Sequence, residues 1–395
     1  MDSIYLDYAS TTPIDPQVLE AMLPYLKDKL GNPGSLHSFG QKTLAAIDFA
    51  RQQIAKTITA NHREIIFTSS ATEANNLVLK GVLKNFFRNR KDCKIIPKII
   101  ISSIEHPSIL ETAKDIEKDG SANIVYLPVD KDGVVDLKVL EKELDENTIL
   151  VSVMWVNNEI GSVQPISKIS EIISKFKKSL PLPLTPYPLF HTDASQAFNL
   201  FDLNVSKSGV DIMTLSSHKI YGPLGSSCLF IRNTTYGILS PIITGGDQEY
   251  GLRAGTENVA SIVGFSKAAE ISHQNYKNEH KRLADISDYF YKSLKKELPK
   301  IESNSPIEEE NLWSPHILNL FVPYNDNLIV ALDIAKIAAS SGSACSQRVE
   351  KPSHVLKSIG FNDDRIKHSV RFSFGRFATK EDIDEATKRI IMKFL

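Results

Sequence analysis

Cysteine is scarce in this chain of 395 residues, which contains only Cys93, Cys228 and Cys345. Three widely separated cysteines cannot build the disulfide framework of a small secreted protein, so we expect a protein of the reducing cytoplasm. The chain also lacks an apolar run of about eighteen residues, which argues against a membrane span. Its first residues, MDSIYLDYAS, lack the basic and apolar segments of a secretory signal.

An excess of one charge is missing too. Lys and Arg total 46, Asp and Glu total 47, and the formal net charge is −1. This balance gives no electrostatic reason to bind nucleic acid or an anionic membrane directly. The rest of the composition, 42% hydrophobic and 24% charged residues, is typical of a globular protein long enough for two domains.

Short apolar runs alternate with helical patterns through the first two thirds of the chain. Strands are predicted at 63–70, 98–103, 149–156, 189–196, 210–217 and 227–232, and helices at 71–87, 106–119 and 166–178. This alternation predicts an α/β fold with a mainly parallel sheet covered by helices on both faces. The proline-rich run 180–190 is predicted to be a surface loop. After about residue 260, a long helix over 261–298 and shorter elements indicate a second, smaller domain.

Polar side chains follow several of these strands. Ligands of open α/β sheets collect at the carboxyl ends of the strands, so these residues are expected to converge on one site. They are Thr72, His106, Asn158, Asp193, Gln196, His218 and Lys219.

Lys219 lies in TLSSHKIYGPLGSSCLF, between a predicted strand and a turn rich in glycine and proline. A lone lysine is usually a surface residue, but an amine in a partly dry site can form an imine with a carbonyl. Pyridoxal 5′-phosphate (PLP) is the commonest cofactor bound in this way. Asp193 could then keep the pyridine nitrogen protonated, or it could cap a helix. Gln196 could donate to the phenolate oxygen, or make a structural hydrogen bond.

Further residues would be needed to hold the phosphate group of PLP, to stack on its ring and to bind a substrate carboxylate. SSATEANN predicts a helix N-terminus at which Thr72 binds an anion or caps the helix, and Ser216 and His218 could add donors. His106 could stack on the ring, with a structural role as the alternative. Arg371 could hold a substrate carboxylate by two hydrogen bonds, or form a surface ion pair.

Cys345 is surrounded by small residues in the run IAASSGSACSQ. Such a run has little side chain to pack, which favours a loop, and an exposed thiol on a loop can be reactive. The alternative is a small buried cysteine, a description that suits Cys228, inside the apolar SSCLFIR, much better. Cys93 has no evident role.

Taken together, these segments resemble the cysteine desulfurases of the NifS/IscS type, within the class V aminotransferase family. The resemblance runs from YLDYASTTPIDP to RFSFGRFATKEDID, nearly the whole chain. It is carried by GNPGSLHSFG, IIFTSSATEANN, IEHPSIL, VNNEIGSVQPI, DASQAF, SSHKIYGPLG, LRAGTEN, SGSACS and PSHVLKSIG. It implies the PLP-dependent transferase fold-type I: an N-terminal segment 1–15 that joins the small domain, a large PLP-binding domain 16–260, and a small α+β domain 261–395 carrying the Cys345 loop.

The resemblance also implies a role for each site residue. Lys219 would hold PLP, Asp193 would pair with its ring nitrogen, and His106 would stack on the ring. Asn158 and Gln196 would contact the phenolate side. The phosphate would be held by Ala71, Thr72, Ser216, His218 and, from the second subunit of a homodimer, Thr256. Arg371 and Asn32 would bind the substrate carboxylate, and Cys345 would be the nucleophile. No metal ligand is implied.

The implied reaction removes sulfur from L-cysteine, giving L-alanine and a persulfide on Cys345. Lys219 would move the α-proton, and a base such as His106 would help to form the substrate thiolate. The persulfide would pass to an acceptor protein, possibly an iron–sulfur scaffold, or serve tRNA thiolation.

Some positions depart from the family pattern. Asp247 and Tyr250 replace a glycine and an arginine before LRAGTEN, which affects the expected subunit contact, and Ser70 replaces a glycine at a helix start. The alternatives are a selenocysteine lyase or another class V PLP enzyme, a sulfur-relay partner without a cofactor, and a thiol hydrolase that pairs Cys345 with His354.

Overall fold

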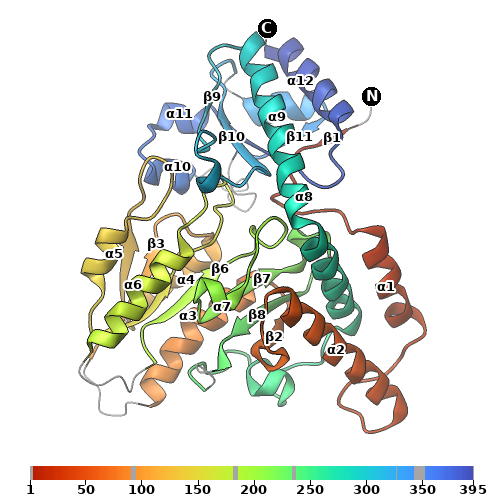
Figure 1. Cartoon of the computed structure of the whole chain (residues 1–395), viewed down its shortest axis with the longest axis vertical. Helices are drawn as coiled ribbons and strands as arrows, with labels where there is room; N and C mark the ends of the chain where they lie inside the picture. Colours follow the sequence, from red (N-terminus) through yellow and green to blue (C-terminus); the bar gives the residue numbers. More distant parts are fainter. Residues whose placement is uncertain are drawn as a thin grey trace.

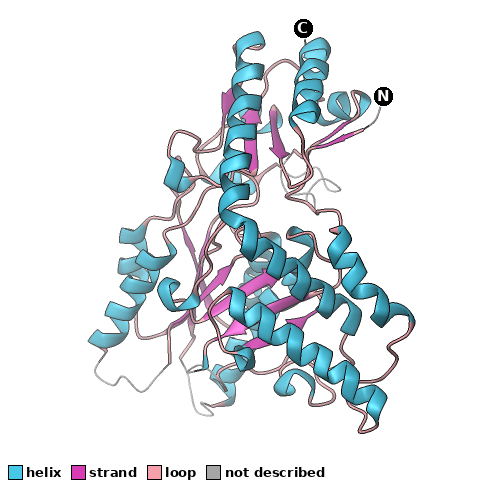
Figure 2. Cartoon of the chain, turned by 45° about the vertical axis from the view of Figure 1, so that its right-hand side comes forward, coloured by secondary structure: helices cyan, strands magenta, loops and turns pink. Residues whose placement is uncertain are grey.

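The computed structural model describes residues 3–89, 95–180, 186–233, 237–325, 327–341 and 352–394. At its centre is a seven-stranded sheet between two layers of helices (Figure 1, Figure 2). The strand order is β2 (Ile65–Thr68), β8 (Ser227–Ile231), β7 (Ile212–Ser216), β6 (Leu189–Asp193), β5 (Thr148–Ser152), β3 (Lys98–Ser102) and β4 (Asn123–Leu127).

The sheet is mainly parallel, as predicted. Only β8 runs against its neighbours β2 and β7. No α-helix is described between β7 and β8, so the short connection that contains Lys219 turns the chain back on itself. The remaining neighbours are parallel pairs joined by helical crossovers.

Side chains alternate between the two faces of the sheet. Ile65 and Phe67 pack into one core, with helices α2 (Ser38–Thr57), α6 (Ile166–Ser179) and the first half of α8 (Val259–Glu297). Ile66 packs into the other core, with α3 (Ala71–Arg88) and α4 (Pro107–Lys118). Because both faces are covered, the strands are continuous apolar runs rather than alternating ones. The sequence shows this pattern.

The strands and helices predicted over residues 63–232 are present with bounds that differ by up to four residues, whereas β4 and α2 were not predicted. The apolar run 149–156 was predicted to be strand throughout, but β5 ends at Ser152. Residues 153–158 are not strand, and all of them except the partly buried Trp155 are buried. Burial, not strand geometry, explains their apolar character, and these residues go on to form part of the pocket described below.

A smaller body lies at one end of the large sheet. It contains a three-stranded antiparallel sheet and a two-stranded parallel sheet, flanked by short helices and α12. The elements are β1 (Ile4–Tyr5), β9 (Glu302–Ser303), β10 (Ile317–Phe321), α9 (Leu328–Ile334), β11 (Ile337–Ala338), α10 (His354–Ser358), α11 (Asp363–Lys367), β12 (Ser369–Ser373) and α12 (Lys380–Phe394).

The chain start and α8 connect the two bodies. Strand β1 pairs with β11, so residues near the N-terminus lie within the smaller body. Helix α8 runs from one body into the other (Figure 1). Phe265 near its start packs in the large core and Phe290 near its end packs in the small core. The domain limits proposed from the sequence, 1–15, 16–260 and 261–395, stay a prediction.

The remaining helices complete the large body. They are α1 (Pro16–Lys27), α5 (Leu137–Glu143) and α7 (Val205–Ser208). Within the described ranges, no helix has both the length and the apolar character required to cross a bilayer.

Candidate active site

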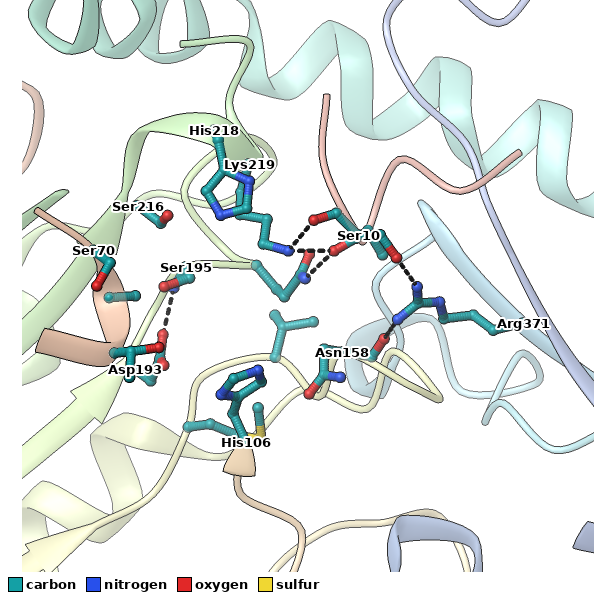
Figure 3. A pocket seen from close by; sticks show the side chains of 16 residues that line it. Ser10, Ser70, His106, Asn158, Asp193, Ser195, Ser216, His218, Lys219 and Arg371 are labelled. Carbon is teal, nitrogen blue, oxygen red and sulfur yellow. Dashed lines mark hydrogen bonds between the residues drawn. The ribbon is translucent and has the colours of Figure 1, made fainter. Parts of the chain in front are cut away.

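A pocket lies at the carboxyl ends of β2, β3, β5, β6 and β7, where the sequence predicted a site (Figure 3). It contains about 820 Å³ of space not filled by protein atoms. The pocket brings together most of the predicted residues, namely Ala71, Thr72, His106, Asn158, Asp193, Gln196, Ser216, His218, Lys219 and Arg371. It adds residues that were not predicted, namely Ala9, Ser10, Ser70, Met154, Val156 and Ser195.

Lys219 closes the short 3-10 turn Ser217–Lys219 that follows β7. Its Nζ donates to two backbone carbonyl oxygens, that of Ala9 at 2.6 Å and that of Ser10 at 2.7 Å. The surface-lysine alternative is therefore wrong, because Lys219 is half-buried and lines the pocket.

Asp193 ends β6 and is buried. Its Oδ2 accepts a hydrogen bond from Asn75 Nδ2 at 2.8 Å, and its Oδ1 accepts one from the Ser195 amide at 2.9 Å. Turns, not a described helix, follow Asp193, so the helix-cap alternative is wrong. Asn75 lies on α3, so this helix helps to fix the orientation of the Asp193 carboxylate.

The N-terminus of α3 forms one end of the pocket. Ser70 is its N-cap, accepting from the Glu73 amide at 3.1 Å, so the helix cap is Ser70 and not Thr72. The buried Ser216 hydroxyl has no hydrogen-bond partner among the described residues. Burial, with the charge of Lys219 nearby, lowers the pKa of His218 to about 3, so its imidazole is neutral. These groups offer hydrogen-bond donors to an anion.

His106 caps helix α4, and it also lines the pocket. Its Nδ1 accepts a hydrogen bond from the Ser108 amide at 3.1 Å. Because an amide can only donate, the neutral ring carries its proton on Nε2. Burial lowers the pKa of His106 to about 4, which keeps the ring neutral near pH 7.

Arg371, on β12, reaches the pocket from the smaller body. It is only 1% exposed and forms an ion pair with Asp7. The ion pair expected as the alternative role is therefore present, but it is buried and not on the surface. Its Nη1 donates to the Asn158 carbonyl at 2.7 Å. Its Nη2 donates to Asp7 and to Ser10 Oγ, both at 2.7 Å. Its Nε contacts no acceptor among the described residues.

Gln196 lies deeper in the wall. Its Nε2 donates to the Ala9 carbonyl at 2.9 Å, and its Oε1 lies 3.1 Å from His316 Nε2. The structural hydrogen bonds considered for Gln196 are therefore present, and its second N–H is the donor left for a ligand.

Two predicted residues, Asn32 and Thr256, are described but do not line this pocket. Asn32 is exposed and its Oδ1 accepts from the Gly34 amide at 2.9 Å. Thr256 is exposed as well. Cys345 lies outside the described residues. Cys228, in contrast, is fully buried in β8, and burial strongly raises the pKa of its thiol, in agreement with the structural role expected for it.

The unusual positions before LRAGTEN lie next to a buried ion pair. Glu249 accepts from Arg51 Nη2 at 2.6 Å and from the Phe67 amide at 2.7 Å. The Tyr250 ring lies 5.4 Å from the Arg51 guanidinium, whereas Asp247 is exposed. The tyrosine thus contacts the cation that holds this loop on α2.

The missed residues Ala9 and Ser10 belong to the turn after β1. Nothing in the local pattern of YLDYAST marks them, because their contact with Lys219 spans about 210 residues. The buried Ser195 hydroxyl has no hydrogen-bond partner among the described residues. Its position two residues after Asp193 is the feature of the sequence that could have predicted it as a site residue.

Comparison with known proteins gives a consistent result over the whole chain. The aminotransferase class-V family profile matches residues 4–386. A protein named cysteine desulfurase IscS from Dictyoglomus turgidum is 41% identical, with 99% of this chain and 95% of that protein covered. The cysteine desulfurase of Homo sapiens is 40% identical, with 98% and 81% covered.

Solved structures agree. A NifS-like protein superposes with a TM-score of 0.88 at 33% identity, with both chains fully covered. A structure described as SspA in complex with cysteine has a TM-score of 0.81 at 32% identity, covering 95% of this chain and 100% of that one. The chain therefore belongs to the class-V aminotransferase family, among the cysteine desulfurases of the NifS and IscS type.

Proposed function

We propose that this protein is a PLP-dependent cysteine desulfurase that converts L-cysteine into L-alanine and leaves the sulfur atom on Cys345 as a persulfide. The single observation that carries the proposal is the convergence of Lys219, Asp193 and the α3 N-terminus on one pocket. Relatives named cysteine desulfurase over nearly the full chain support it, as does the neighbour solved with cysteine.

The pocket fits PLP at three points. Lys219 supplies an amine for the aldehyde, and the buried carboxylate of Asp193 suits the ring nitrogen. The α3 N-terminus and the Ser216 hydroxyl, which has no described partner, suit the phosphate. When bound, PLP acts as an electron sink for negative charge on the substrate α-carbon.

Proton movement is assigned to Lys219. The carbonyl oxygens of Ala9 and Ser10 hold its amine at the pocket wall, from where it can take up or return a proton. His106 carries its ring proton on Nε2 and has a pKa of about 4. It is better suited to donate a hydrogen bond from Nε2 than to deprotonate the substrate thiol, the role first expected for it.

Arg371 is assigned to the substrate carboxylate. Asp7, Ser10 and the Asn158 carbonyl fix the guanidinium, so its orientation is set before a ligand arrives. These contacts leave one Nη1 hydrogen and the Nε hydrogen as the donors for a carboxylate.

Cys345 is assigned to sulfur transfer because both flanks of its segment are fixed near the pocket. The Ser340 amide and carbonyl pair with Arg371, and Ser353 bonds Glu159. In the sequence, Cys345 follows Ser340, the backbone partner of Arg371, by only five residues.

The wider assignments are also proposals. We infer a cytoplasmic homodimer in which Thr256 completes the phosphate site of the second subunit. The persulfide then serves an acceptor protein, an iron–sulfur scaffold or a tRNA-thiolation pathway.

Two observations bear on the alternatives. His354 Nε2 lies 3.0 Å from the Glu105 carbonyl oxygen and donates to it, which weakens the pairing of His354 with Cys345 in a thiol hydrolase. A cofactor-free relay protein would not need a buried Asp193 facing a lysine across one pocket.

The decisive experiment is an absorption spectrum of the purified protein with PLP, before and after L-cysteine, with alanine measured alongside. We expect a visible band that changes with L-cysteine and is missing in Lys219→Ala, together with alanine release. A protein that stays colourless after incubation with PLP would refute the proposal. Comparing alanine release from cysteine and selenocysteine distinguishes a desulfurase from a selenocysteine lyase.

A further inference from the structure

Glu105 is a fully buried carboxyl group beside the pocket. It lies three residues after the end of β3 and immediately before His106. Acidic side chains are almost never fully buried without a partner charge, so this position needs a physical reason.

The contacts of Glu105 tie two pocket segments together. Its Oε1 accepts from Ser102 Oγ at 2.6 Å, at the end of β3, and from the Met154 amide at 2.7 Å, in the loop after β5. Met154 lines the pocket, as does the neighbouring residue His106. One carboxyl oxygen thus bridges the turn that carries His106 and the loop that leads to Asn158.

The same turn is held by its backbone. Asn157 Nδ2 donates to the Ile104 carbonyl at 3.0 Å. His354, on α10, donates to the Glu105 carbonyl at 3.0 Å. The turn is therefore fixed from β3, from the loop after β5 and from α10.

The second oxygen of Glu105 indicates which form of the acid is present. Oε2 is buried and has no hydrogen-bond partner among the described residues. Within the same part of the chain, no lysine or arginine pairs with this carboxyl. The charged group that acts on it is the Asp193 carboxylate, on β6. His106, the N-cap residue before α4, is neutral. A bare negative charge in this place would be very costly, whereas a protonated oxygen is tolerated.

We propose that Glu105 is a positioning residue of this site, a neutral carboxylic acid that locks the His106 turn to the pocket loop 153–158. This inference rests on the proposed cofactor site. Its chemistry follows from the geometry: Oε1 is the carbonyl oxygen that accepts both hydrogen bonds, and Oε2 carries the proton.

The pKa of Glu105 agrees with this assignment. Burial, with the charge of Asp193, raises it to about 8, against the hydrogen bonds from Ser102 and Met154, which lower it. In the unfolded chain a glutamate titrates near pH 4.3. The folded protein therefore keeps a proton that the unfolded chain loses, and stability falls as pH rises from about 4.3 to about 8.

The test compares two variants with the wild type, each loaded with PLP. Glu105→Gln keeps the carbonyl acceptor and cannot ionise. We expect it to retain the visible circular dichroism of the bound cofactor and the turnover of L-cysteine. Its melting temperature should fall less than that of the wild type between about pH 6.5 and pH 8, above the range in which histidines of the unfolded chain gain protons.

Glu105→Leu keeps the volume but leaves the Met154 amide without an acceptor. We expect cofactor to bind with an altered circular dichroism band and kcat/KM to fall on the order of 100-fold, because the pocket wall shifts. If this variant does not fold, Glu105→Asp, which is too short to reach both donors, replaces it. Glu159→Gln, at a second buried carboxyl outside the pocket lining, should leave the cofactor band unchanged.

Two outcomes would overturn the inference. If Glu105→Gln loses the band and the turnover as Glu105→Leu does, the carboxyl works as an anion. If Glu105→Leu, or Glu105→Asp in its place, matches the wild type, Glu105 positions nothing. A wild type that never develops a cofactor band would instead contradict the proposed function, and the pH dependence of melting would still decide the protonation of Glu105.

Discussion

At the scale of single residues, the pocket is organised by hydrogen bonds among its own side chains. Asn75 and the Ser195 amide hold Asp193, while Ala9 and Ser10 hold Lys219. Residue types at strand ends were sufficient to predict Asp193 and Lys219. The partners were not predictable in this way, because they are far away in sequence and belong to ordinary residue types.

Asp193→Asn tests whether the carboxylate acts as a charge or only as a structural acceptor. The amide oxygen can still accept from Asn75 or from the Ser195 amide, but it cannot stabilise a protonated ring nitrogen. We expect turnover of L-cysteine to fall roughly 100-fold, a loss typical of one electrostatic contact in an active site. Steady-state kinetics with the cofactor content measured would check this, and unchanged turnover would show that Asp193 only shapes the turn.

Cys345→Ser tests the proposed sulfur acceptor. A serine hydroxyl cannot hold sulfur as a persulfide, so sulfide and persulfide production should fall to background. The pocket residues are untouched, so the visible cofactor band and its response to L-cysteine should remain. Persulfide labelling with mass spectrometry measures persulfide production, and absorption measures the cofactor band. Persulfide formation elsewhere at the wild-type rate would reject this role.

At the scale of helices and strands, periodicity predicted the large sheet well. Buried strands are continuous apolar runs, and α3 and α4 begin at residues that cap them, Ser70 and His106. The exception was 149–156, where a buried loop has the same apolar composition as a buried strand. The apolar composition of 149–156 therefore indicates that the segment is mostly buried, but it does not indicate its backbone conformation.

The Arg51–Glu249 pair fixes the loop before α8 to α2 and β2. Its side chains are 6% and 2% exposed. Glu249→Ala leaves a buried guanidinium without a partner, so we expect a loss of about 3–5 kcal/mol in the free energy of unfolding. Urea denaturation measures this loss.

A matched control is the exposed pair of Lys80 and Asp115, with side chains 41% and 58% exposed. Asp115→Ala should cost no more than about 1 kcal/mol. The double variant Arg51→Met with Glu249→Leu should recover part of the loss, because no charge stays buried, while the Phe67 amide still lacks its acceptor. Equal losses for the buried and exposed pairs would contradict this view of the loop.

At the scale of the whole molecule, the pocket is complete only because the two bodies meet. Arg371 comes from β12 of the smaller body and Ser10 from the chain start, whereas Lys219 and Asp193 come from the large sheet. Helix α8 passes through both cores and holds the bodies together.

Buried histidines make the whole molecule sensitive to acid. Burial lowers the pKa of His106 and His191 to about 4, and of His218 and His316 to about 3. An unfolded histidine titrates near 6.5, so below this pH the unfolded chain binds more protons. Stability is therefore present above about pH 6.5 and is lost as pH falls toward about 3, by roughly 1.4 kcal/mol per pH unit for each group.

Melting temperature as a function of pH checks this expectation. The proton held by Glu105 makes stability fall as pH rises, but this single group is outweighed at acid pH by the four histidines. His191 lies between Ser152 and Thr214 in the sheet. His191→Asn should make the acid slope shallower, and a slope that does not change would show that His191 is not one of its sources.

The α/β class, the strand ends that carry polar residues, and the desulfurase family could all be inferred from the residues in order, because periodicity and motif order are local properties. Three contacts could not be inferred in this way: Ala9 and Ser10 hold Lys219, Arg371 is buried beside Asn158, and Glu105 bridges to Met154. These contacts join residues that are far apart in the chain, and only the packing of the sheet, the chain start and the smaller body brings them within hydrogen-bonding distance.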